Sequence, residues 1–529
     1  MISIPIDQAK VAQARALGQK IARNVLSDSG RHTTTSIERT ALRFIGVSGV
    51  AEGGAPFPNL LVSEIQRKGG LSKGSLWWLG RELLTEGSLD RVLAKAALGV
   101  AFEPTPVTSE EDLAIRETVR SLVGERSAEL TRIRDGRRKF KETLSEPPQP
   151  WKYLIVATGS IFDDVVQARA AAEAGADIIA VIRSTAQSLL DYVPDGVTTE
   201  GYGGTYATQE NFRVMRKALD EVSRSLGRYV RLTNYSSGLC MPEIACIAAF
   251  EGLDVLLNDA MYGILFRDIN MKRTFCDQYV SRLICAKSSI IINTGEDNYL
   301  TTADAVEKAH TVLASLFINE AFAIEAGLKP ELMGLGHAFE IDPSKKDQIV
   351  YEIAQALLVR GIFPDSPIKY MPPTKHKSGD IFYSHVLDSM FNLVSTATGQ
   401  SIHLLGMMTE AMHNPLLMDR FESLKSANYI FNAAKSLGME LRIEPGGMIA
   451  SRAQEVLEKA LDLLREAAGI GLPAAIESAM FADISRKANG GKGLDGVVEK
   501  APDYFNPVVS ILEKELEVGS NCGSGEVAV

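Results

Sequence analysis

Apolar runs that end in polar residues and lead into amphipathic helices repeat along the chain from Trp151 onward. Each repeat predicts a strand followed by a helix. The eight predicted strands lie in the segments "YLIVATGS", "AGADIIAVIRS", "YVRLTNYSS", "DVLLNDA", "IIINTGEDN", "LMGLGHAFEID", "IKYMPP" and "SIHLLGMMTEA". Alternating strands and helices favour a parallel sheet with right-handed crossovers, and eight such units predict an α/β fold closed into a TIM-type barrel over residues 151–438.

An open, doubly wound parallel sheet is the structural alternative. It is weaker because no GxGxxG sequence follows the first predicted strand and no GxxxxGKS/T sequence occurs, so both phosphate-binding loops typical of that class are missing. Residues 1–150 are predicted to form a helical accessory segment. Residues 439–529 are predicted to form a C-terminal extension with one more strand, "MELRIEP", two helices and a flexible tail.

Charge and composition argue against several classes of protein function. The chain has 56 Lys and Arg against 66 Asp and Glu, and its net charge of −10 argues against a general nucleic-acid binder. The basic run "RIRDGRRKFK", at 132–141, has acidic neighbours and is typical of a solvated or partner-facing helix. No apolar run approaches the roughly eighteen residues of a membrane span, and no secretory signal is evident.

The cysteines and histidines give no support for a metal site. Five cysteines are odd in number and too sparse for a disulfide framework, so a reducing, cytoplasmic location is expected. None of them forms a CxxC sequence, no HExxH sequence occurs, and the seven histidines are scattered. We therefore expect neither zinc nor an iron–sulfur cluster.

The stretch "SSIIINTGEDNYLTTADAV" carries more polar groups than its fold requires. Three consecutive isoleucines, Ile290 to Ile292, indicate a strand that is buried on both faces. Thr301 or Thr302 already offers an N-cap for a helix predicted over 303–314. The acidic and amide residues between strand and helix are Asn293, Glu296, Asp297 and Asn298. This cluster is surplus to folding and therefore a candidate site.

A TIM-type barrel places its chemistry at the carboxyl ends of its strands, so the polar strand ends are candidate site residues. They are Thr158, Ser160, Arg183, Ser184, Asn234, Ser236, Ser237, Asn258, Asp259, Asp297, Asn298, His337, Lys369 and Glu410. Hydroxyl groups and cations suit a ligand that carries phosphate and a polar heterocycle. Tyr262 could cover a planar ring, with Arg267 five residues further on.

Several of these positions have a structural alternative. A single serine or asparagine at a strand end commonly caps a turn, and His337 could be a hydrogen-bonded core histidine. A functional role is favoured for Lys369, because a lysine inside the short strand "IKYMPP" has no easy route to solvent. The same argument favours a functional role for Arg183, which ends the strand "IIAVIRS".

Five long segments resemble one known family. They are "IIAVIRSTAQSLLDYVPDG", "NYSSGLCMPEIA", "LLNDAMYGILFRDINMKRTF", "INTGEDNYLTT" and "IKYMPPTKHKSGDIF". Together they closely resemble the lysine 5,6-aminomutase alpha-subunit family, through the barrel and both flanks. The resemblance implies an isomerase of lysine degradation that uses pyridoxal 5'-phosphate and adenosylcobalamin. It would move the terminal amino group of D-lysine or L-β-lysine to the adjacent carbon by a radical 1,2-shift.

The resemblance also implies roles for individual residues. Arg183, Ser188 and Ser237 match positions that hold the cofactor phosphate, and Tyr262 matches an aromatic residue against the cofactor ring. Arg267 and Asn298 match further cofactor contacts, with Asn298 near the pyridine nitrogen. Asp297 and Lys369 match a charged pair beside cofactor and substrate, so Tyr262, Asp297 and Lys369 are the residues expected to take part in catalysis.

The chain lacks the DxHxxG sequence of base-off cobalamin enzymes. In the family that this chain resembles, the cobalamin domain and the lysine that forms the resting aldimine with pyridoxal phosphate belong to a smaller beta subunit. The resemblance therefore implies a catalytic barrel within an α2β2 hetero-oligomer. D-ornithine aminomutase is a poorer match, because it carries the cobalamin module in its large chain.

Two other functions stay open from the sequence. A Schiff-base lyase or aldolase could use the same barrel with Lys369 as its nucleophile. A noncatalytic assembly subunit would need neither Lys369 nor Arg183.

Overall fold

A parallel β-barrel forms the centre of the computed structural model, which describes residues 2–182, 187–201, 204–259 and 261–518. Its strands are β2 (Trp151–Ile155), β3 (Ile178–Ile182), β4 (Arg231–Tyr235), β5 (Val255–Leu257), β6 (Ile291–Asn293), β7 (Met333–Gly334), β8 (Gly336–Ala338), β9 (Lys369–Met371) and β10 (Ile402–Leu404). Neighbours pair in parallel in the order β7-β6-β5-β4-β3-β2-β10-β9-β8.

One interrupted segment closes the ring. Strands β7 and β8 are separated only by Leu335; β7 pairs with β6 and β8 pairs with β9. The backbone N–H of Leu335 donates to Met333, and its carbonyl accepts from Lys369 at 2.9 Å. The two short strands correspond to the single predicted strand "LMGLGHAFEID", so the predicted TIM-type barrel is confirmed.

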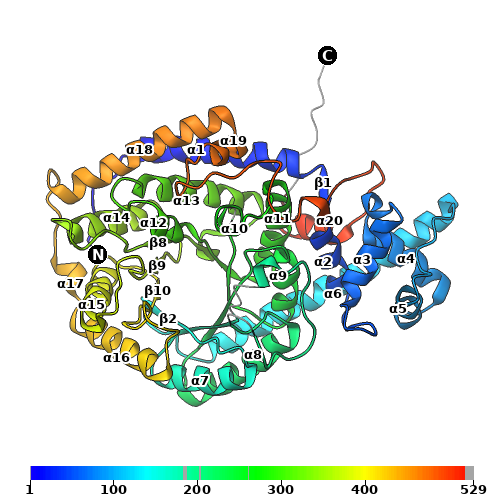
Figure 1. Cartoon of the computed structure of the whole chain (residues 1–529), viewed down its shortest axis with the longest axis horizontal. Helices are drawn as coiled ribbons and strands as arrows, with labels where there is room; N and C mark the ends of the chain where they lie inside the picture. Colours follow the sequence, from blue (N-terminus) through cyan, green and yellow to red (C-terminus); the bar gives the residue numbers. More distant parts are fainter. Residues whose placement is uncertain (1, 183–186, 202–203, 260, 519–529) are drawn as a thin grey trace.

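Helices form a ring around the barrel, as Figure 1 shows. They are α7 (Ile161–Glu173), α8 (Gln209–Leu226), α9 (Met241–Phe250), α11 (Met271–Ser288), α13 (Ala309–Glu325), α14 (Gln348–Ile362), α15 (Ile381–Ala397) and α16 (Leu417–Ala433). Short elements are inserted where strands end: η2 (Gln187–Leu189), α10 (Tyr262–Arg267), η3 (Glu296–Asn298) and α12 (Tyr299–Thr302). These insertions supply the polar residues of the barrel mouth.

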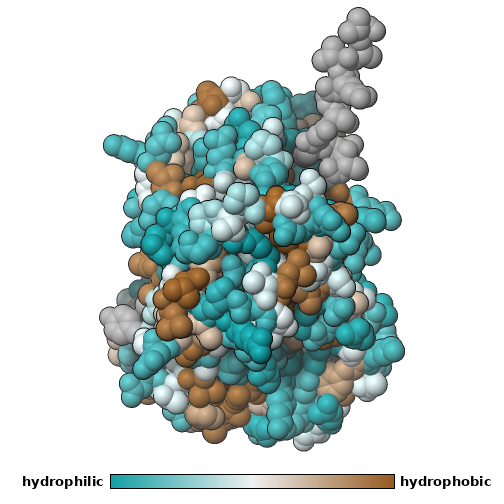
Figure 2. All heavy atoms as spheres, turned by 90° about the vertical axis from the view of Figure 1, so that its right-hand side faces the viewer, coloured by the Kyte–Doolittle hydropathy of each residue, from teal (hydrophilic) through white to brown (hydrophobic). Residues whose placement is uncertain are grey.

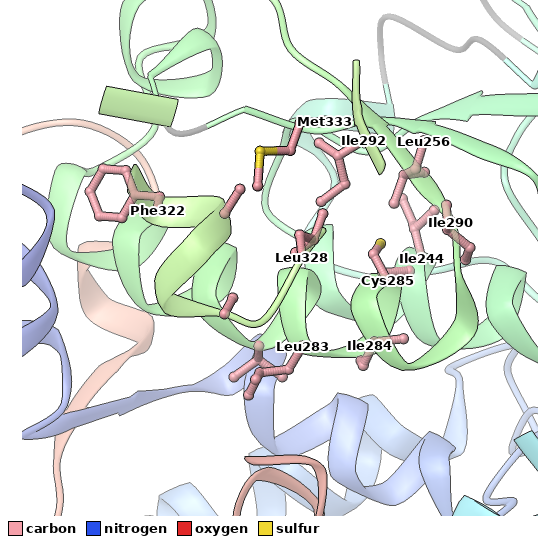
Figure 3. Packing of buried hydrophobic residues seen from close by; sticks show 14 of the residues in the cluster. Ile244, Leu256, Leu283, Ile284, Cys285, Ile290, Ile292, Phe322, Leu328 and Met333 are labelled. Carbon is pink, nitrogen blue, oxygen red and sulfur yellow. The ribbon is translucent and has the colours of Figure 1, made fainter. Parts of the chain in front are cut away.

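Strand residues alternate between an inner and an outer core. The inner cluster consists of Trp151, Tyr153, Ile178, Ala180, Ala338, Met371, Ile402 and Leu404. Their chain neighbours on the strands, such as Leu154, Ile179 and Ile292, belong to the large cluster packed under the helices. Figure 3 shows this outer packing, with Leu256 and Ile292 directed towards side chains of the surrounding helices.

The segments that precede and follow the barrel in the sequence pack against the barrel and against each other. The first is helical: α1 (Gln8–Ser29), α2 (Thr35–Phe44), α3 (Phe57–Arg67), η1 (Leu71–Lys73), α4 (Ser75–Glu86), α5 (Leu89–Ala97) and α6 (Ser109–Glu142), with strand β1 (His32–Thr34). The second comprises α17 (Leu437–Glu440), α18 (Met448–Ile470), α19 (Leu472–Glu477), η5 (Leu494–Gly496), β11 (Val497–Glu499) and α20 (Pro507–Glu515). Strands β1 and β11 pair antiparallel, and α1 lies beside α18 outside α13 (Figure 1).

The surface over the first helices is mixed in character. Figure 2 shows hydrophobic residues in separate groups among hydrophilic ones on this side of the molecule. Leu84, Leu98 and Val100 are among the exposed apolar residues of this segment. Among the described residues, no helix combines the length and the apolar character needed to cross a bilayer.

Two local predictions were wrong. The helix expected over 303–314 begins only at Ala309, because Asp304 accepts hydrogen bonds from the backbone N–H groups of Val306 and Glu307 and forms a turn there. Thr302 lies inside α12 and donates to Ala482 instead of capping a following helix. The predicted strand "MELRIEP" has no partner strand in the described structure; its first residues end the short helix α17.

Asp254, just before β5, fastens the accessory helix α6 to the amino-terminal side of the barrel. Its carboxylate accepts hydrogen bonds from Arg216 at 2.7 Å and from the Tyr229 hydroxyl at 2.7 Å, and lies 2.8 Å from Lys141 Nζ. Burial by itself would raise the pKa of Asp254, but the cations Lys141, Arg216 and Arg137 outweigh burial and hold it below its ordinary value.

We therefore predict that Asp254→Asn lowers the free energy of unfolding by about 3 kcal/mol, because Arg216 stays buried without this countercharge. The folded pKa lies below the unfolded value of about 3.9, so the difference from wild type should be constant above about pH 5 and shrink as the pH falls below about 4. Urea unfolding of both proteins across this pH range measures the difference in the free energy of unfolding. Asp135→Asn, which removes a more exposed carboxylate of α6, should cost less than about 1 kcal/mol; equal losses would contradict the role of Asp254.

Candidate functional site

A buried ion pair crosses the barrel mouth. Lys369 is the first residue of β9 and points into the barrel, and its Nζ lies 2.5 Å from Asp297 Oδ2 on η3. The Lys369 side chain is 2% exposed and the Asp297 side chain 0%. Gly336 lies beside Lys369 on β8, and a Cβ there would be 3.5 Å from Asp297 Cγ and 2.6 Å from the Thr294 carbonyl. The absence of a side chain at Gly336 leaves the room in which Lys369 reaches Asp297.

The ion pair keeps Lys369 protonated. Burial alone would lower the pKa of this lysine, but the neighbouring Asp297 carboxylate outweighs burial and raises it above its ordinary value. Nζ also lies 3.5 Å from the Thr294 carbonyl oxygen, which can accept a hydrogen bond. Lys369 therefore acts here as a fixed positive charge.

Asn298 is held beside this pair. Its Nδ2 donates to Asp297 Oδ1 at 2.8 Å and to the Gly295 carbonyl at 3.1 Å, and its backbone N–H donates to the same carboxylate oxygen at 3.1 Å. The Asp297 carboxylate thus has one oxygen towards Lys369 and the other towards Asn298. Two of the surplus polar residues of the sequence, Asp297 and Asn298, therefore form one connected group with Lys369.

An aromatic residue and a cation come from the loop after β5. Tyr262 begins α10 and Arg267 ends it, and the Arg267 guanidinium donates to the Tyr262 hydroxyl at 3.3 Å. The Tyr262 ring stacks on Phe266, with ring centroids 5.1 Å apart. Gly295 lies against it, since a Cβ there would be 3.0 Å from Tyr262 Cδ2. Tyr262 is thereby placed next to the loop that carries Asp297.

Two predicted phosphate-binding positions meet next to the end of β4. Ser188 on η2 and the segment after Ser237 are in direct contact, because a Cβ at Gly238 would be 2.4 Å from the Ser188 carbonyl oxygen. That carbonyl accepts a hydrogen bond from Leu239 at 3.1 Å. The hydroxyl of Ser237 is buried and makes no hydrogen bond within the described structure. Arg183 and Ser184, the other predicted residues of this region, lie outside the described residues.

Sequence reasoning missed two further polar residues that line the barrel interior, Tyr153 and Tyr235. Tyr153 and Tyr235 point inward from β2 and β4, and their hydroxyl groups lie 3.1 Å apart. Tyr235 is also close enough to Lys369 to contribute to its raised pKa. Asn293 was noted only as a member of the polar cluster; both polar atoms of its side chain are buried without a partner in the described structure. The alternation of inward-facing and outward-facing residues along each strand is the signal that could have identified the tyrosines.

Other polar strand ends do not join the site. Ser160 caps α7 through a hydrogen bond from the N–H of Asp163, and Thr158 accepts from the N–H of Ser160 in the same turn. His337 points outward, stacks on Tyr370 at 4.3 Å, and burial lowers its pKa to about 4. Glu410 pairs with Lys377 at 2.8 Å. The structural alternative was correct for Ser160 and His337.

A double-mutant cycle tests the ion pair. We predict that Asp297→Asn and Lys369→Met each lower the free energy of unfolding by about 3 kcal/mol, because each leaves a buried charge without its partner. The double variant should lose at least about 1 kcal/mol less than the sum, since it removes both charges. Urea unfolding of the four proteins gives these energies.

Glu422 and Lys425 provide the matched control, because this pair lies on the surface of α16 with side chains 40% and 68% exposed. Its coupling energy should stay below about 0.5 kcal/mol. Strict additivity of Asp297→Asn and Lys369→Met would mean that the two side chains do not pair in solution.

Comparison with known proteins identifies the family. The family described as "D-Lysine 5,6-aminomutase TIM-barrel domain of alpha subunit" matches residues 4–511. A lysine 5,6-aminomutase alpha subunit of Fusobacterium nucleatum is 48% identical over 513 residues, which cover 97% of this chain and 99% of that protein. One from Acetoanaerobium sticklandii is 49% identical over 507 residues, covering 96% and 98%.

A more distant relative is the D-ornithine 4,5-aminomutase subunit beta of Acetoanaerobium sticklandii. It is 28% identical over 386 residues, which cover 70% of this chain and 52% of that protein. The two lysine 5,6-aminomutase relatives match over nearly their whole length and at much higher identity. The chain therefore belongs to the lysine 5,6-aminomutase alpha-subunit family, whose members are subunits of an isomerase.

Proposed function

We propose that this chain is the catalytic, pyridoxal-phosphate-binding subunit of an adenosylcobalamin-dependent lysine 5,6-aminomutase. Its substrate would be D-lysine or L-β-lysine, and the reaction would move the terminal amino group to the adjacent carbon. The observation that carries the proposal is a barrel mouth where a fixed charge pair, an aromatic ring and buried hydroxyls without partners lie together.

Buried polar atoms without partners support a bound cofactor in this mouth. Ser236 and Ser237 at the end of β4 have buried hydroxyls without hydrogen bonds in the described structure, and the side chain of Asn293 on β6 is likewise without a partner. Leaving such groups unpaired in a folded protein costs free energy, so these groups support the binding of a polar ligand here. Hydroxyl donors at one side of the mouth and a planar aromatic residue at the other fit a phosphorylated pyridine.

We assign a role to each predicted residue. Ser188 and Ser237 would hold the phosphate together with Arg183, which lies outside the described residues. Tyr262 would lie against the pyridine ring, with Arg267 contacting it from the side and Asn298 near the ring nitrogen. Pyridoxal phosphate would supply a conjugated system for amino-group migration, and adenosylcobalamin a carbon-centred radical.

The protein's own contribution is position, charge and exclusion of water. Asp297 and Lys369 are both buried, so their charges act in a medium with little solvent screening. A neutral amide such as Asn298 at the ring nitrogen would not protonate it, which suits a radical shift better than carbanion chemistry. Asp297 holds this amide in place and balances the charge of Lys369 at the same time.

The raised pKa of Lys369 favours this proposal over a Schiff-base lyase. A nucleophilic lysine must lose its proton, and enzymes achieve this by lowering its pKa. Here the carboxylate of Asp297 lies 2.5 Å from Nζ and favours the protonated form. Lys369 is therefore suited to orienting an anionic or polar group and poorly suited to attacking a carbonyl carbon.

A smaller partner subunit completes the proposal. The two lysine 5,6-aminomutase relatives described above are called alpha subunits, and this chain covers 98% or more of their length. No DxHxxG sequence occurs in the chain. We therefore assign corrinoid binding, and the lysine that holds pyridoxal phosphate covalently, to a separate beta subunit in an α2β2 assembly.

Replacement of Ser237 tests the phosphate site. We predict that Ser237→Ala weakens pyridoxal phosphate binding about fivefold, the effect of one hydrogen bond, and leaves the free energy of unfolding unchanged because the hydroxyl has no partner in the described structure. Absorbance titration of the cofactor into the chain with its partner measures the affinity. The control Ser160→Ala should cost about 1 kcal/mol of stability as a lost helix cap, with cofactor affinity unchanged. Wild-type affinity in Ser237→Ala would remove Ser237 from the site.

Borohydride reduction tests which subunit holds pyridoxal phosphate covalently. We expect reduction of the cofactor-loaded complex to attach the pyridoxal group to the partner chain, and none to this chain, because Lys369 is held protonated by Asp297. Peptide mapping by mass spectrometry identifies the labelled lysine. Label on Lys369 would support the Schiff-base lyase instead.

A further inference from the structure

A second buried carboxylate connects two loops of the barrel mouth. Asp259 follows β5, and its side chain is fully buried. Its Oδ1 accepts hydrogen bonds from the backbone N–H groups of Met261 at 2.6 Å and Tyr262 at 2.5 Å. Its Oδ2 accepts from the backbone N–H of Gly295 at 2.7 Å, in the loop after β6. One side chain therefore fixes the start of α10 and the start of η3.

The contact with Gly295 leaves no spare room. A Cβ at Gly295 would lie 2.4 Å from Asp259 Oδ2, so the loop approaches the carboxylate as closely as a backbone can. The next three residues along this loop are Glu296, Asp297 and Asn298. The backbone at Tyr262, on the other side of Asp259, carries the ring that lies over Gly295. A change at Asp259 would therefore alter the distance between Tyr262 and Asp297.

A buried polar network supports this carboxylate from below. Gln278 donates to the Asp259 carbonyl, and Arg282 donates to Gln278 at 2.8 Å and to Asn319 at 2.7 Å. Asn319 in turn donates to Glu296. Burial, followed by the nearby Asp259, raises the pKa of Glu296 well above its ordinary value, so Glu296 is the neutral member of the two acids. Burial raises the pKa of Asp259 as well, but the hydrogen bonds from the backbone N–H groups of Tyr262, Met261 and Gly295 oppose this effect, so Asp259 is the better place for the negative charge.

We propose that Asp259 is a positioning residue that sets the aromatic ring of Tyr262 at a fixed distance and angle from Asp297 and Asn298. The inference rests on the proposed function insofar as Tyr262 and Asn298 contact pyridoxal phosphate. The link between the two loops does not depend on that function, because it consists of hydrogen bonds from backbone N–H groups of both loops to the Asp259 carboxylate.

Asp259→Asn tests the link in the full-length chain. The amide of asparagine can take two orientations: in one its Nδ2 faces the Gly295 N–H, and in the other it faces the N–H groups of Met261 and Tyr262, so each connection is lost in one of the two orientations. Hydrogen exchange with mass spectrometry should show exchange at least about tenfold faster in the segments around both Tyr262 and Gly295, because the loops lose their common anchor. The matched control is Glu296→Gln, which replaces an adjacent neutral buried acid by an amide of similar size and should leave both segments protected.

The cofactor gives a second readout in the complex with the partner. Asp259→Asn should weaken pyridoxal phosphate binding at least about tenfold and change the induced circular dichroism of the bound cofactor, which reports its orientation; Glu296→Gln should do neither. If Asp259→Asn does not fold, Gly295→Ala disturbs the same contact from the opposite loop and should give the same pattern. Faster exchange in only one segment, or equal effects of Asp259→Asn and Glu296→Gln, would overturn the link between the loops.

A failure of this inference and a failure of the proposed function give different results. Faster exchange in both segments with unchanged cofactor affinity and dichroism would overturn the positioning role of Asp259. Absence of pyridoxal phosphate binding in the wild-type complex would refute the proposed function and, with it, the cofactor-related part of the inference. The exchange data would still decide whether Asp259 joins the two loops.

Discussion

Alternation of side chains along strands of a closed barrel is the constraint on which the rest of the structure depends. A residue on such a strand faces either the enclosed interior or the surrounding helices, and neither environment is aqueous. On β9, Lys369 and Met371 face inward while Tyr370 faces the helices. A charged residue on the inward side must find its partner within the barrel, and Lys369 finds Asp297.

The polar groups of the barrel mouth differ in how many of their polar atoms have a hydrogen-bond or ion-pair partner. Asp259 has hydrogen-bond donors for both oxygens, and Asp297 has Asn298 at one oxygen and the charge of Lys369 at the other, so two negative charges lie buried from solvent. Ser237 and Asn293 have none for their side chains in the described structure. Fully paired groups give the mouth a fixed geometry, whereas unpaired ones favour occupation by a ligand. The same few residues thus combine rigidity with a capacity to bind.

The accessory helices contribute to this mouth as well. Asp191, just beyond η2, lies 2.5 Å from Arg39 of α2 and 3.0 Å from Arg273 of α11. Asn59 of α3 donates to the Asp191 carbonyl at 2.8 Å. The segment that carries Ser188 is therefore fixed from outside the barrel, while Asp259 fixes the loops on the other side. The helices before the barrel act on the site without touching it.

The sequence by itself determined the barrel, the family and most of the candidate residues. Apolar strands that alternate with amphipathic helices bury their apolar residues best in a parallel sheet covered by helices. Long motifs such as "INTGEDNYLTT" are specific enough to identify relatives. Local signals were less reliable: the helix expected over 303–314 was displaced by the turn at Asp304, and the pairing of β1 with β11 gave no local sign. The tyrosines inside the barrel were equally hidden, although their strands were predicted.

Only the tertiary structure decided which polar residues meet. Lys369 and His337 both looked like strand-end candidates, yet one faces inward and pairs with Asp297 while the other faces outward and stacks on Tyr370. Their neighbours in sequence do not distinguish them, because the direction of a side chain depends on the phase of its strand within the closed ring. Contacts such as that of Asp259 with Gly295 depend on the spacing of adjacent strands. That spacing exists only once the barrel has closed.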